Sequence, residues 1–384
     1  MPTTRMDSRR AMARTADILV VGLGASGSAA AYHAALHGDT VLGFDASTPP
    51  HQGGSSHGGS RIIRKAYFEG AFYVPFLQRA YALWQDLEAR TGQHLLHETG
   101  ILMIGPPDAG LVAGARAAAE QHNLPYRMFS ADAARRHHPA FDVPDDQVAL
   151  WEAEAGWLDP ELCIQTHLTE ATRLGATLHY DTPITGWHAT DTSVTVTTRA
   201  GEQYEGARLL LCAGGWMTDL LPSARIPLHI ERQVNVWFTP QSEVVRDPNL
   251  PVYLWQCAPD QLLYGFPHRG AGLKAGLHYH GAVTAHPDAI NRTVTAADVD
   301  ALVVPMQRLF NDAVRPSDET MTCFYTVTPD KHYLVDQHPA ADSVWVVSAC
   351  SGHGFKASNA IAAHVVELVT ERTDIALPQA FAWR

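Results

Sequence analysis

The chain has 384 residues, of which 46% are hydrophobic and 18% charged, a composition that excludes a disordered chain and suits a globular protein of two domains. Its formal net charge of −12 disfavours nucleic acids and anionic membranes as partners, and no apolar run is long enough to span a bilayer. The five cysteines are scattered without a Cys-x-x-Cys pair, which indicates neither a disulfide framework nor a zinc site and fits a reducing compartment.

Residues 1–15 are expected to form a disordered extension. They contain Arg9-Arg10, a pair found in twin-arginine export signals, but no small-residue cleavage region separates this pair from the first predicted strand. We therefore expect a cytoplasmic protein.

Residues 16–46 predict a strand, a glycine turn, a helix and a second strand. The apolar run at 18–21 contains β-branched residues and is typical of a strand buried on both faces. Residues 28–36 are rich in alanine and free of proline, which predicts a helix, and 40–44 form the second strand. The order of these elements indicates a dinucleotide-binding unit.

The turn in this unit has the pattern Gly22-x-Gly24-x-x-Gly27. The first glycine permits a tight turn, the second lets the backbone approach a pyrophosphate, and the third lets the helix pack closely on the strand. Asp45 ends the second strand, at the spacing of a carboxylate that binds ribose hydroxyl groups. This acid argues against a 2′-phosphate, so FAD or NAD is favoured over NADP, and the local sequence leaves FAD and NAD both open.

A loop rich in Pro, Gly, Ser and His covers residues 47–60, and we expect it to be too polar to pack. Arg61-Ile-Ile-Arg64 follows it and would place two guanidinium groups beside the nucleotide. An amphipathic helix is predicted over 73–90, and a hairpin over 93–105.

The middle of the chain alternates between predicted helices and strands. Helices are expected over 108–123 and 160–174, with a short one capped by Ser130 between them, and a strand over 148–157. A β-meander over 176–211 then ends in a buried strand that runs into the glycine turn 212–216. Such a turn would give a two-nucleotide cofactor its second contact.

The last part predicts short strands over 226–320 and a helix near 296–314, then a buried strand at 344–347, a glycine turn and a closing helix over 357–370. The expected fold class is therefore α/β, with a Rossmann-like cofactor domain and an inserted β-rich substrate domain. We assign 16–90, 148–225 and 321–384 to the cofactor domain, and 91–147 and 226–320 to the substrate domain.

Several further motifs occur in the same order from about residue 16 to the C-terminus. They are Gly22–Gly27, Ser56–Tyr67, Cys212–Trp216, Tyr264–Pro267, Gly272–His278, Cys323–Asp330 and Ser351–Lys356. With these motifs the chain resembles the monomeric sarcosine oxidase and N-methyltryptophan oxidase family of flavoproteins.

The resemblance implies FAD bound covalently through the sulfur of Cys323. It also implies a monomer that oxidises a secondary amine on an amino acid, with O2 as the electron acceptor and hydrogen peroxide as product. For an N-methyl substrate, the imine would hydrolyse to an amine and formaldehyde. The cofactor-binding residues implied are Gly22, Gly24, Ala25, Ser26, Gly27, Asp45, Ser55, His57, Ser60, Arg61, Cys212, Gly214, Trp216, Cys323, Gly352, Gly354, Phe355 and Lys356.

Two of these residues, His57 and Arg61, match positions that assist flavin attachment in the family. Attachment needs a thiolate, so a cation near Cys323 should lower the pKa of its thiol. The alternative for Cys323 is a small buried hydrophobic residue.

Arg64 and Lys356 match the pair that holds the substrate carboxylate, and an arginine fork suits a carboxylate. The alternative is a pair of surface cations. Lys274 lies in an apolar predicted strand and matches the residue that activates oxygen, where a cation stabilises developing superoxide charge. A snorkelling lysine on an edge strand is the alternative.

His278 would lie on the same strand face as Lys274, beside the substrate, and a hydrogen-bonded core histidine is the alternative. Tyr264 and Tyr325 match aromatic residues on the substrate side, although Tyr264 also suits an aromatic core. We thus expect Lys274, Arg61, His278 and Tyr325 to act in catalysis. His278-Tyr-His280 has metal-ligand spacing, but the sequence shows no third ligand, so no metal is expected.

The chain departs from the family pattern at two places. Gly59-Ser60 replaces an Asp-Thr pair, which removes a charge near the flavin and frees the loop. His268-Arg269 adds a cation in an expected loop between Tyr264 and Lys274. Both changes bear on the substrate rather than on the class of reaction.

Three other functions stay open at this stage. One is the same oxidation of glycated amino acids, pipecolate or proline. Another is a dehydrogenase that passes electrons to a protein or quinone, against which Lys274 argues. The third is a flavin-binding sensor or scaffold without turnover, which would need none of Arg64, Lys274 and Lys356.

Overall fold

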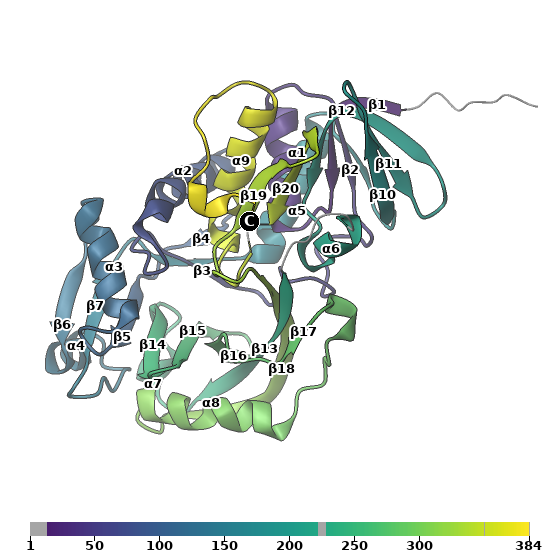
Figure 1. The fold of residues 1–384 in the computed structure, drawn as a ribbon. Coiled ribbons are helices and arrows are strands. Elements are labelled where there is room, and N and C mark those ends of the chain that lie inside the picture. Colours follow the sequence, from purple (N-terminus) through teal and green to yellow (C-terminus); the bar gives the residue numbers. More distant parts are fainter. Residues whose placement is uncertain (1–13, 222–227, 349, 384) are drawn as a thin grey trace, which may run out of the picture.

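The computed structural model describes residues 14–221, 228–348 and 350–383 (Figure 1). Residues 1–13 of the expected extension and the expected domain boundary at 225 lie outside this part of the chain. The extension is also shorter than expected. The first strand, β1 (Arg14–Val21), begins at Arg14 and pairs from its first residue with β12 (Gln203–Leu211).

An eight-stranded sheet forms the upper part of the molecule in Figure 1. Its parallel centre has the order β9 (Thr177–His179), β2 (Val41–Phe44), β1, β12 and β20 (Ala341–Ser348). An antiparallel meander of β10 (Ile184–Ala189), β11 (Val194–Thr198) and β12 extends one side, and β19 (Leu334–His338) pairs with β20. A parallel sheet with glycine turns after its strands is the arrangement expected for a dinucleotide site.

Helices pack against this sheet and against one another. They are α1 (Ala25–Leu36), α2 (Val74–Thr91), α5 (Pro160–Arg173), the short α6 (Met217–Leu220) and α9 (Ser358–Val369), and α1 contacts both α5 and α9. Most residues of α1 are buried, including its alanines, because small side chains let the neighbouring helices approach closely. The start of α5 is fixed by Asp159, whose side chain accepts a hydrogen bond of 3.0 Å from Leu162 N.

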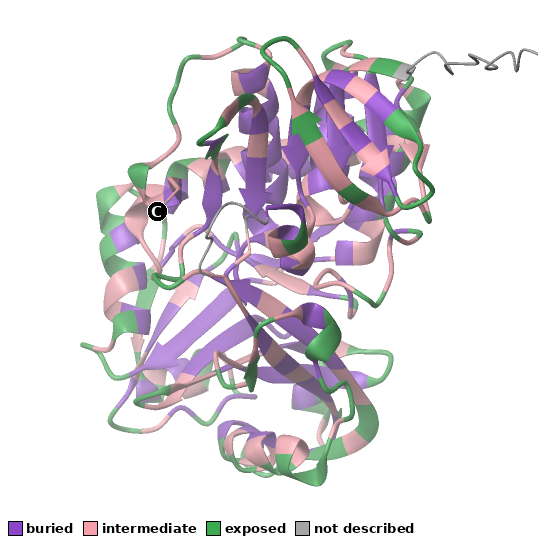
Figure 2. Ribbon diagram, turned by 45° about the vertical axis from the view of Figure 1, so that its right-hand side comes forward, coloured by how far each residue is buried: buried purple, intermediate pink, exposed green. Residues whose placement is uncertain are grey.

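A nine-stranded sheet forms the lower part of the molecule. Helix α8 (Ala296–Leu309) covers the face of this sheet that points away from the eight-stranded sheet (Figures 1 and 2). Leu302 and Met306 of α8 join the core of Phe238, Tyr253 and Leu273 on that face. The other helices beside this sheet are α3 (Gly110–Gln121), α4 (Ala131–His137) and α7 (Glu243–Arg246). Its strands are β5 (Ile101–Gly105), β6 (Arg127–Ser130), β7 (Val148–Glu152), β13 (His229–Pro240), β14 (Val252–Ala258), β15 (Gln261–Arg269), β16 (Gly272–His278), β17 (Val283–Thr284) and β18 (Val314–Val327).

A small third sheet lies between the two large sheets (Figure 1). In sequence, its strands occur where the chain passes from one large sheet to the other. It consists of β3 (Arg61–Ile63), β4 (Leu96–His97) and β8 (Gly156–Leu158). The short 3₁₀ segments include η2 (Gly214–Trp216) and η4 (Phe355–Ala357), each of which follows a glycine turn. The others are η1 (Ala71–Tyr73), η3 (Pro287–Ala289) and η5 (Gln379–Phe381).

Strand pairing differs from the prediction in three places. The hairpin expected over 93–105 is wrong, because β4 pairs with β8 while β5 pairs with β7 and β14. The strand expected over 148–157 is two strands, β7 and β8, that belong to different sheets. The meander expected from residue 176 excludes β9, which pairs in parallel with β2. Each error concerns the partner of a strand, which tertiary contacts decide.

Packing corrects three more expectations. The loop over 47–60 was expected not to pack, but His57 and Ser60 are only 3% and 5% exposed. Strands in the 226–320 region are long rather than short, since β13 has 12 residues and β18 has 14. His268 and Arg269 end β15 instead of lying in a loop.

The expected α/β fold with a Rossmann-like cofactor part is confirmed by the parallel sheet, its glycine turns and its helices. The expected division into two domains stays a prediction, and β7, placed with the cofactor domain by sequence, lies in the nine-stranded sheet. Within the described ranges, none of the helices has the length and apolar character needed to cross a membrane.

Candidate active site

The glycine turn after β1 combines close packing with open space. A Cβ atom on Gly27 would lie 1.7 Å from the Gly22 carbonyl oxygen, so this glycine sets how closely α1 approaches β1. Gly22 itself has φ +88, which favours glycine, and a Cβ atom there would lie 2.5 Å from the Cys212 carbonyl oxygen. A Cβ atom on Gly24 would meet no atom of the described residues within 4 Å. The turn is therefore open on the side of Gly24.

The N-terminus of α1 is suited to bind an anion. Among the described residues it has no side-chain cap, and no acidic residue lies in its first turn. The first N–H groups of a helix lack intrahelical partners and carry the positive end of its dipole. Beside an open glycine turn, such a helix end is a site for a pyrophosphate.

The carboxylate of Asp45 is fixed at the end of β2. Its Oδ2 accepts a hydrogen bond of 2.7 Å from Leu23 N, and its Oδ1 accepts one of 2.9 Å from Ser47 N. These two contacts hold the carboxylate next to the glycine turn. This position is the one expected for a group that binds ribose.

A cavity of about 540 Å³ joins this turn to the nine-stranded sheet. Gly27 and His57, both predicted to bind the cofactor, are not part of its wall. The wall contains the other predicted residues, namely Gly22, Gly24, Ala25, Ser26, Asp45, Ser55, Ser60, Arg61, Arg64, Cys212, Gly214, Trp216, Tyr264, Lys274, His278, Cys323, Tyr325, Gly352, Gly354, Phe355 and Lys356. The structure thus gathers residues from the first, middle and last thirds of the chain.

Cys323 lies on β18, only 4% exposed, in the wall of the cavity. Burial raises the pKa of its thiol, while the nearby charges of Arg61 and Lys274 lower it, and burial outweighs them. The cations expected near this thiol are therefore present, but they do not bring its pKa below the ordinary value. Cys350 lines the same cavity and is a second thiol within it.

Arg61 lines the cavity with this thiol, whereas His57 does not. Arg61 donates hydrogen bonds to the carbonyl oxygens of Ser60 (2.8 Å) and Ser55 (2.6 Å), so its guanidinium is fixed by the preceding loop. The buried ring of His57 lies behind the cavity wall, and burial together with the charge of Arg61 lowers its pKa to about 4. His57 is therefore neutral at physiological pH.

The guanidinium of Arg64 is buried, with 2% of the residue exposed, and is already paired with a carboxylate. Its NH2 group lies 2.6 and 2.8 Å from the two oxygens of Glu69, and NH1 donates to the Ala66 carbonyl oxygen at 2.7 Å. Burial raises the pKa of Glu69, but Arg64, His353 and Lys356 together outweigh burial and bring the value to about 2. Glu69 is therefore ionised over the working range of pH. Both residues line the cavity.

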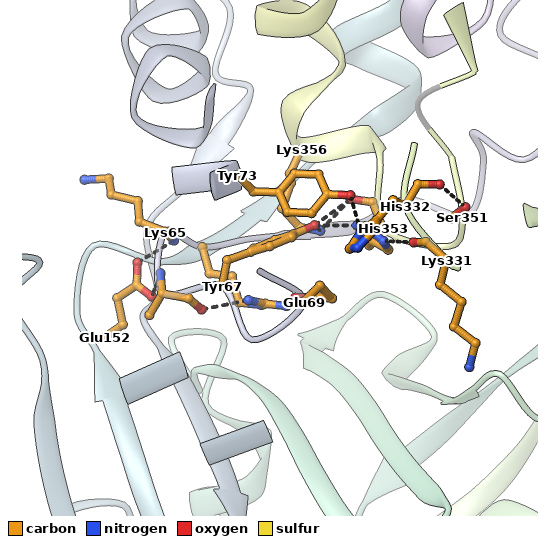
Figure 3. Close-up of polar contacts among 12 residues, drawn as sticks. Lys65, Tyr67, Glu69, Tyr73, Glu152, Lys331, His332, Ser351, His353 and Lys356 are labelled. Atoms are coloured by element: carbon orange, nitrogen blue, oxygen red, sulfur yellow. Dashed lines mark hydrogen bonds and ion pairs between the residues drawn. The ribbon is translucent and has the colours of Figure 1, made fainter. Parts of the chain in front are cut away.

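Lys356 lies beside this ion pair, and Figure 3 shows its side chain directed to Tyr67 and His353. Its Nζ donates to the His353 carbonyl oxygen at 2.8 Å and to the Tyr67 hydroxyl at 3.2 Å. Burial and the charge of Arg64 lower the pKa of Lys356 to about 7. The surface-cation alternative for Arg64 and Lys356 is therefore wrong, because both are buried in the cavity wall.

Lys274 is 4% exposed on β16, which has neighbours on both sides. The alternative of a snorkelling lysine on an edge strand is therefore wrong. Its Nζ donates to the carbonyl oxygens of Gly58 (2.8 Å) and Ser60 (2.9 Å) and lies 4.3 Å from the centre of the Phe266 ring. Burial holds the pKa of Lys274 well below its usual range.

His278 and two tyrosines complete the wall beside Lys274. His278 Nδ1 lies 3.1 Å from the Tyr325 hydroxyl, and Tyr264 donates to Asn235 Oδ1 at 3.0 Å. Burial lowers the pKa of His278 to about 3, so its ring is neutral. All three predicted residues face the cavity, although His278 is also hydrogen-bonded as a core histidine would be. Within the described residues, no cluster of side chains could bind a metal ion.

Comparison with known proteins identifies the family. The sequence profile described as FAD dependent oxidoreductase matches residues 17–368. The chain belongs to this family. It is 41% identical to monomeric sarcosine oxidase of Streptomyces avermitilis, over 90% of this chain and 91% of that one. It is 33% identical to N-methyl-L-tryptophan oxidase of Yersinia pestis, over 90% and 92% of the two chains.

Membership of this family confirms the resemblance inferred from the motifs. It also decides between the two nucleotides that Asp45 left open, in favour of FAD. The fold agrees with a solved structure of NikD, described as an unusual amino acid oxidase essential for nikkomycin biosynthesis. That structure has a TM-score of 0.83 at 23% identity and covers 96% of this chain and 97% of its own.

The residues around the glycine turn fit FAD. The turn is open at Gly24, the end of α1 is uncapped, and Asp45 is held in place. The far part of the cavity carries two buried cations for an anionic group, Arg64 and Lys356. The arrangement can bind a dinucleotide and, next to it, a small molecule with a carboxylate.

Two residues of the site were missed by sequence reasoning. Glu69 carries the counter-charge of Arg64, and His353 supplies the carbonyl oxygen for Lys356. An acid five positions after Arg64, directly after the apolar stretch 66–68, is a usable signal for Glu69. His353 lies in the motif Ser351–Lys356, but nothing in the sequence indicates that its backbone carbonyl oxygen would accept a hydrogen bond from Lys356.

Proposed function

We propose that this protein oxidises secondary-amine amino acids, N-methyl amino acids foremost, to imines and reduces O2 to hydrogen peroxide. Two electrons and two protons leave the C–N unit of the substrate and reduce one O2. Water then hydrolyses the imine, and an N-methyl substrate yields an amine and formaldehyde. The observation that carries the proposal is the pair of buried cations, Arg64 and Lys356, in the wall of a cavity whose other end fits FAD.

The relatives support this reaction class. Their names give sarcosine and N-methyl-L-tryptophan as substrates, both of which are N-methyl amino acids. When bound, FAD supplies the redox chemistry, and the protein supplies binding, orientation and electrostatics. A monomer is proposed from the name of the first of these relatives, and sedimentation of the purified protein tests it.

Arg64 and Lys356 would bind the carboxylate of the substrate. An arginine fork can take both carboxylate oxygens, whereas Lys356 adds a point charge. Because NH2 of Arg64 already pairs with Glu69 and NH1 donates to the Ala66 carbonyl oxygen, the substrate carboxylate must displace Glu69 or share the guanidinium with it. Substrate binding therefore includes a rearrangement of this ion pair.

The substrate amine would bind in its deprotonated form. Glu69 and His278 have pKa values of about 2 and about 3, so neither is a good base at neutral pH. The cations of the cavity also disfavour a protonated amine next to them. A rate of flavin reduction at saturating substrate that does not rise with pH as the bound amine loses its proton would count against this step.

Lys274 would favour the reaction with oxygen. A buried ammonium stabilises negative charge that develops on oxygen, and few protein groups compete for this one, since its partners are two neutral carbonyl oxygens. This role separates an oxidase from a dehydrogenase that uses another acceptor.

Cys323 is the proposed point of covalent attachment of FAD. It lies in the cavity wall with two cations near it, which stabilise the thiolate that attachment needs. Cys323→Ser should let acid release the yellow colour into the supernatant, whereas the wild type should keep it in the pellet. Cys350→Ser is the matched control in the same cavity and should behave like the wild type. Release from the wild type would show that the flavin is not covalently bound.

We also propose that the two large sheets correspond to two domains. The eight-stranded sheet carries the glycine turns, and the nine-stranded sheet carries Lys274, His278 and Cys323. Under this division the cofactor lies along the first sheet and the substrate between the two.

The test of the function is a substrate panel under air. Hydrogen peroxide and formaldehyde should form in equal amounts from sarcosine or N-methyl-L-tryptophan. Arg64→Met and Lys356→Met should raise KM far more than they lower kcat, because they remove carboxylate binding. Turnover of pipecolate, proline or a fructosyl amino acid without turnover of any N-methyl amino acid would contradict the proposed substrate class.

A further inference from the structure

Residues 58–60 lie between two opposite charges. On one side the carboxylate of Glu161, in the first turn of α5, accepts backbone N–H hydrogen bonds. Gly58 donates at 2.6 Å, and Gly59 donates at 3.2 and 3.3 Å to the two oxygens. On the other side, Lys274 Nζ donates to the carbonyl oxygens of Gly58 and Ser60, at 2.8 and 2.9 Å.

The backbone of this turn has the form of an anion-binding nest. Gly58 and Gly59 have φ values of +97 and +74, so successive N–H groups point toward one anion. Within the part of the chain that the structure describes, a Cβ atom on Gly59 would meet no atom within 4 Å, so glycine serves the conformation there and not the packing. The anion in this nest is the Glu161 carboxylate of the protein itself.

A third side chain holds the same turn. Arg269 donates to the Gly59 carbonyl oxygen at 3.3 Å, and its guanidinium lies 4.0 Å from the centre of the Trp157 ring. Trp157 in turn stacks on His97 at 3.7 Å between ring centres. Gly59 and Arg269, two places where the chain departs from the family pattern, are therefore in direct contact. The added cation fixes the turn and does not line the cavity.

We propose that Glu161 is a positioning residue that keeps Lys274 charged and in place for its reaction with oxygen, acting through the turn 58–60. The carboxylate orients the Gly58 and Gly59 peptide groups, and the oriented turn presents its carbonyl oxygens to the ammonium. The inference rests on the oxygen reaction proposed for Lys274. It adds a residue from α5, more than a hundred positions away in the sequence, to that reaction.

The charge of Glu161 matters for the protonation of Lys274, because two other charged groups near Lys274 are arginines. Arg61 and Arg269 disfavour the ammonium form, while Glu161 and the Cys323 thiol, when ionised, favour it. His57 also faces this group but is neutral, because its pKa is about 4. Since the Cys323 thiol has a raised pKa, Glu161 is the carboxylate that offsets the two arginines.

The experiment measures reoxidation of the holoenzyme by oxygen across pH. Each enzyme is reduced anaerobically with N-methyl amino acid and then mixed with aerated buffer in a stopped-flow instrument. In Glu161→Gln, the midpoint of the pH profile should move down by about one unit and reoxidation above it should slow about tenfold. Reduction by substrate should change less than about twofold, a difference too small to indicate lost binding.

Two variants separate charge from structure. Glu161→Asp keeps the charge one methylene farther away and should shift the midpoint in the same direction by less. Glu88→Gln is the matched control, because the Glu88 carboxylate also accepts from two successive backbone N–H groups, of Leu95 (2.6 Å) and Leu96 (2.9 Å). It should leave both half-reactions at the wild-type rate.

A second measurement follows the protonation of Lys274 in enzyme that is not turning over. Competitive acetylation of the oxidised holoenzyme, followed by mass spectrometry of the peptide with Lys274, gives the fraction of free amine at each pH. The titration of Lys274 should move to lower pH in Glu161→Gln by about one unit and stay unchanged in Glu88→Gln.

Lys274→Met distinguishes a failure of the oxygen role proposed for Lys274 from a failure of the inference about Glu161. If it reoxidises as fast as the wild type, the oxygen role of Lys274 is wrong and the inference falls with it. If Lys274→Met is slow but Glu161→Gln keeps the wild-type midpoint and acetylation profile, the inference alone is overturned. If Glu161→Gln does not retain flavin, Glu161→Asp is measured instead. A midpoint of its reoxidation pH profile equal to that of the wild type would also overturn the inference about Glu161.

Discussion

Arg64, which we propose binds the substrate carboxylate, is already paired with a carboxylate of the protein in this structure. Its NH2 group pairs with both oxygens of Glu69, and both side chains are largely buried, with 2% and 12% of their surface exposed. A buried charge without its partner is costly, so Glu69 keeps Arg64 stable in the free enzyme while competing with the substrate carboxylate. Stability and affinity are therefore opposed at this residue.

Glu69→Gln should bind simple carboxylates more tightly, by about tenfold or more, because one negative charge leaves the cavity. The same change should lower the free energy of unfolding by about 3 kcal/mol, since it leaves Arg64 buried without a counter-ion. Titration with acetate and denaturation by urea measure the two effects. Glu154→Gln is the control, because Glu154 pairs with Lys65 at the surface and should matter by less than about 1 kcal/mol. Weaker acetate binding in Glu69→Gln would contradict this account.

Lys356 should make anion binding depend on pH. Its pKa of about 7 in the free enzyme lies below the usual value, so the ammonium that attracts a carboxylate is lost as pH rises above 7. A bound anion favours the charged form, and binding above pH 7 therefore takes up a proton. The dissociation constant of acetate should rise by up to about tenfold per pH unit above 7 and be flat below it. In Lys356→Met the rise should disappear, and a rise that persists would assign the titration to another group.

Among the residues of the site, the sequence predicts the positively charged side chains better than the groups that contact them. Motifs place Arg64, Lys274 and Lys356, and all three lie in the cavity wall. Glu161 escaped prediction because its contact with Gly58 joins positions 103 residues apart. A long-range contact of this kind leaves no local pattern.

At the scale of elements, the glycine turn does two separate jobs. Gly27 governs the contact between α1 and β1, whereas Gly24 leaves room where the pyrophosphate would pass. Gly27→Ala should therefore destabilise the fold by about 1–3 kcal/mol or more, through overpacking against the Gly22 carbonyl oxygen. Gly24→Ala should leave the fold intact and yield protein with much less flavin.

Thermal denaturation and the flavin absorbance of each purified variant test this contrast. The two effects belong to different residues of one motif, so each variant is the control for the other. A Gly24→Ala protein with full flavin content would show that the cofactor does not pass over this glycine.

Elements with a local signature were predicted well. The helix after the glycine turn has its alanine pattern, and Ser130 and Asp159 cap the helices that follow them. Strand partners were harder to predict. Residues 96–97 and 101–105 look like the two arms of a hairpin but join different sheets, because burial against distant segments decides which strands pair.

On the scale of the whole molecule, the proposed function depends on a cavity lined by residues of both large sheets. The dinucleotide end belongs to the parallel sheet, and the nine-stranded sheet places Lys274 and His278 opposite it. The chain passes between the two sheets several times, so residues far apart in sequence meet in one wall (Figure 1). Sequence motifs could predict which residues gather there, but not the contacts among them, which depend on how the sheets face each other.

Under the proposed function, electrons pass from an N-methyl amino acid to oxygen within this cavity. The most direct test mixes the purified yellow protein with sarcosine or N-methyl-L-tryptophan without oxygen, and then admits air. We predict that the flavin absorbance bleaches with substrate and returns in air, with one hydrogen peroxide formed for each flavin. Bleaching that does not reverse in air would indicate a dehydrogenase, and no bleaching by any N-methyl amino acid would contradict the proposed binding of substrate by Arg64 and Lys356.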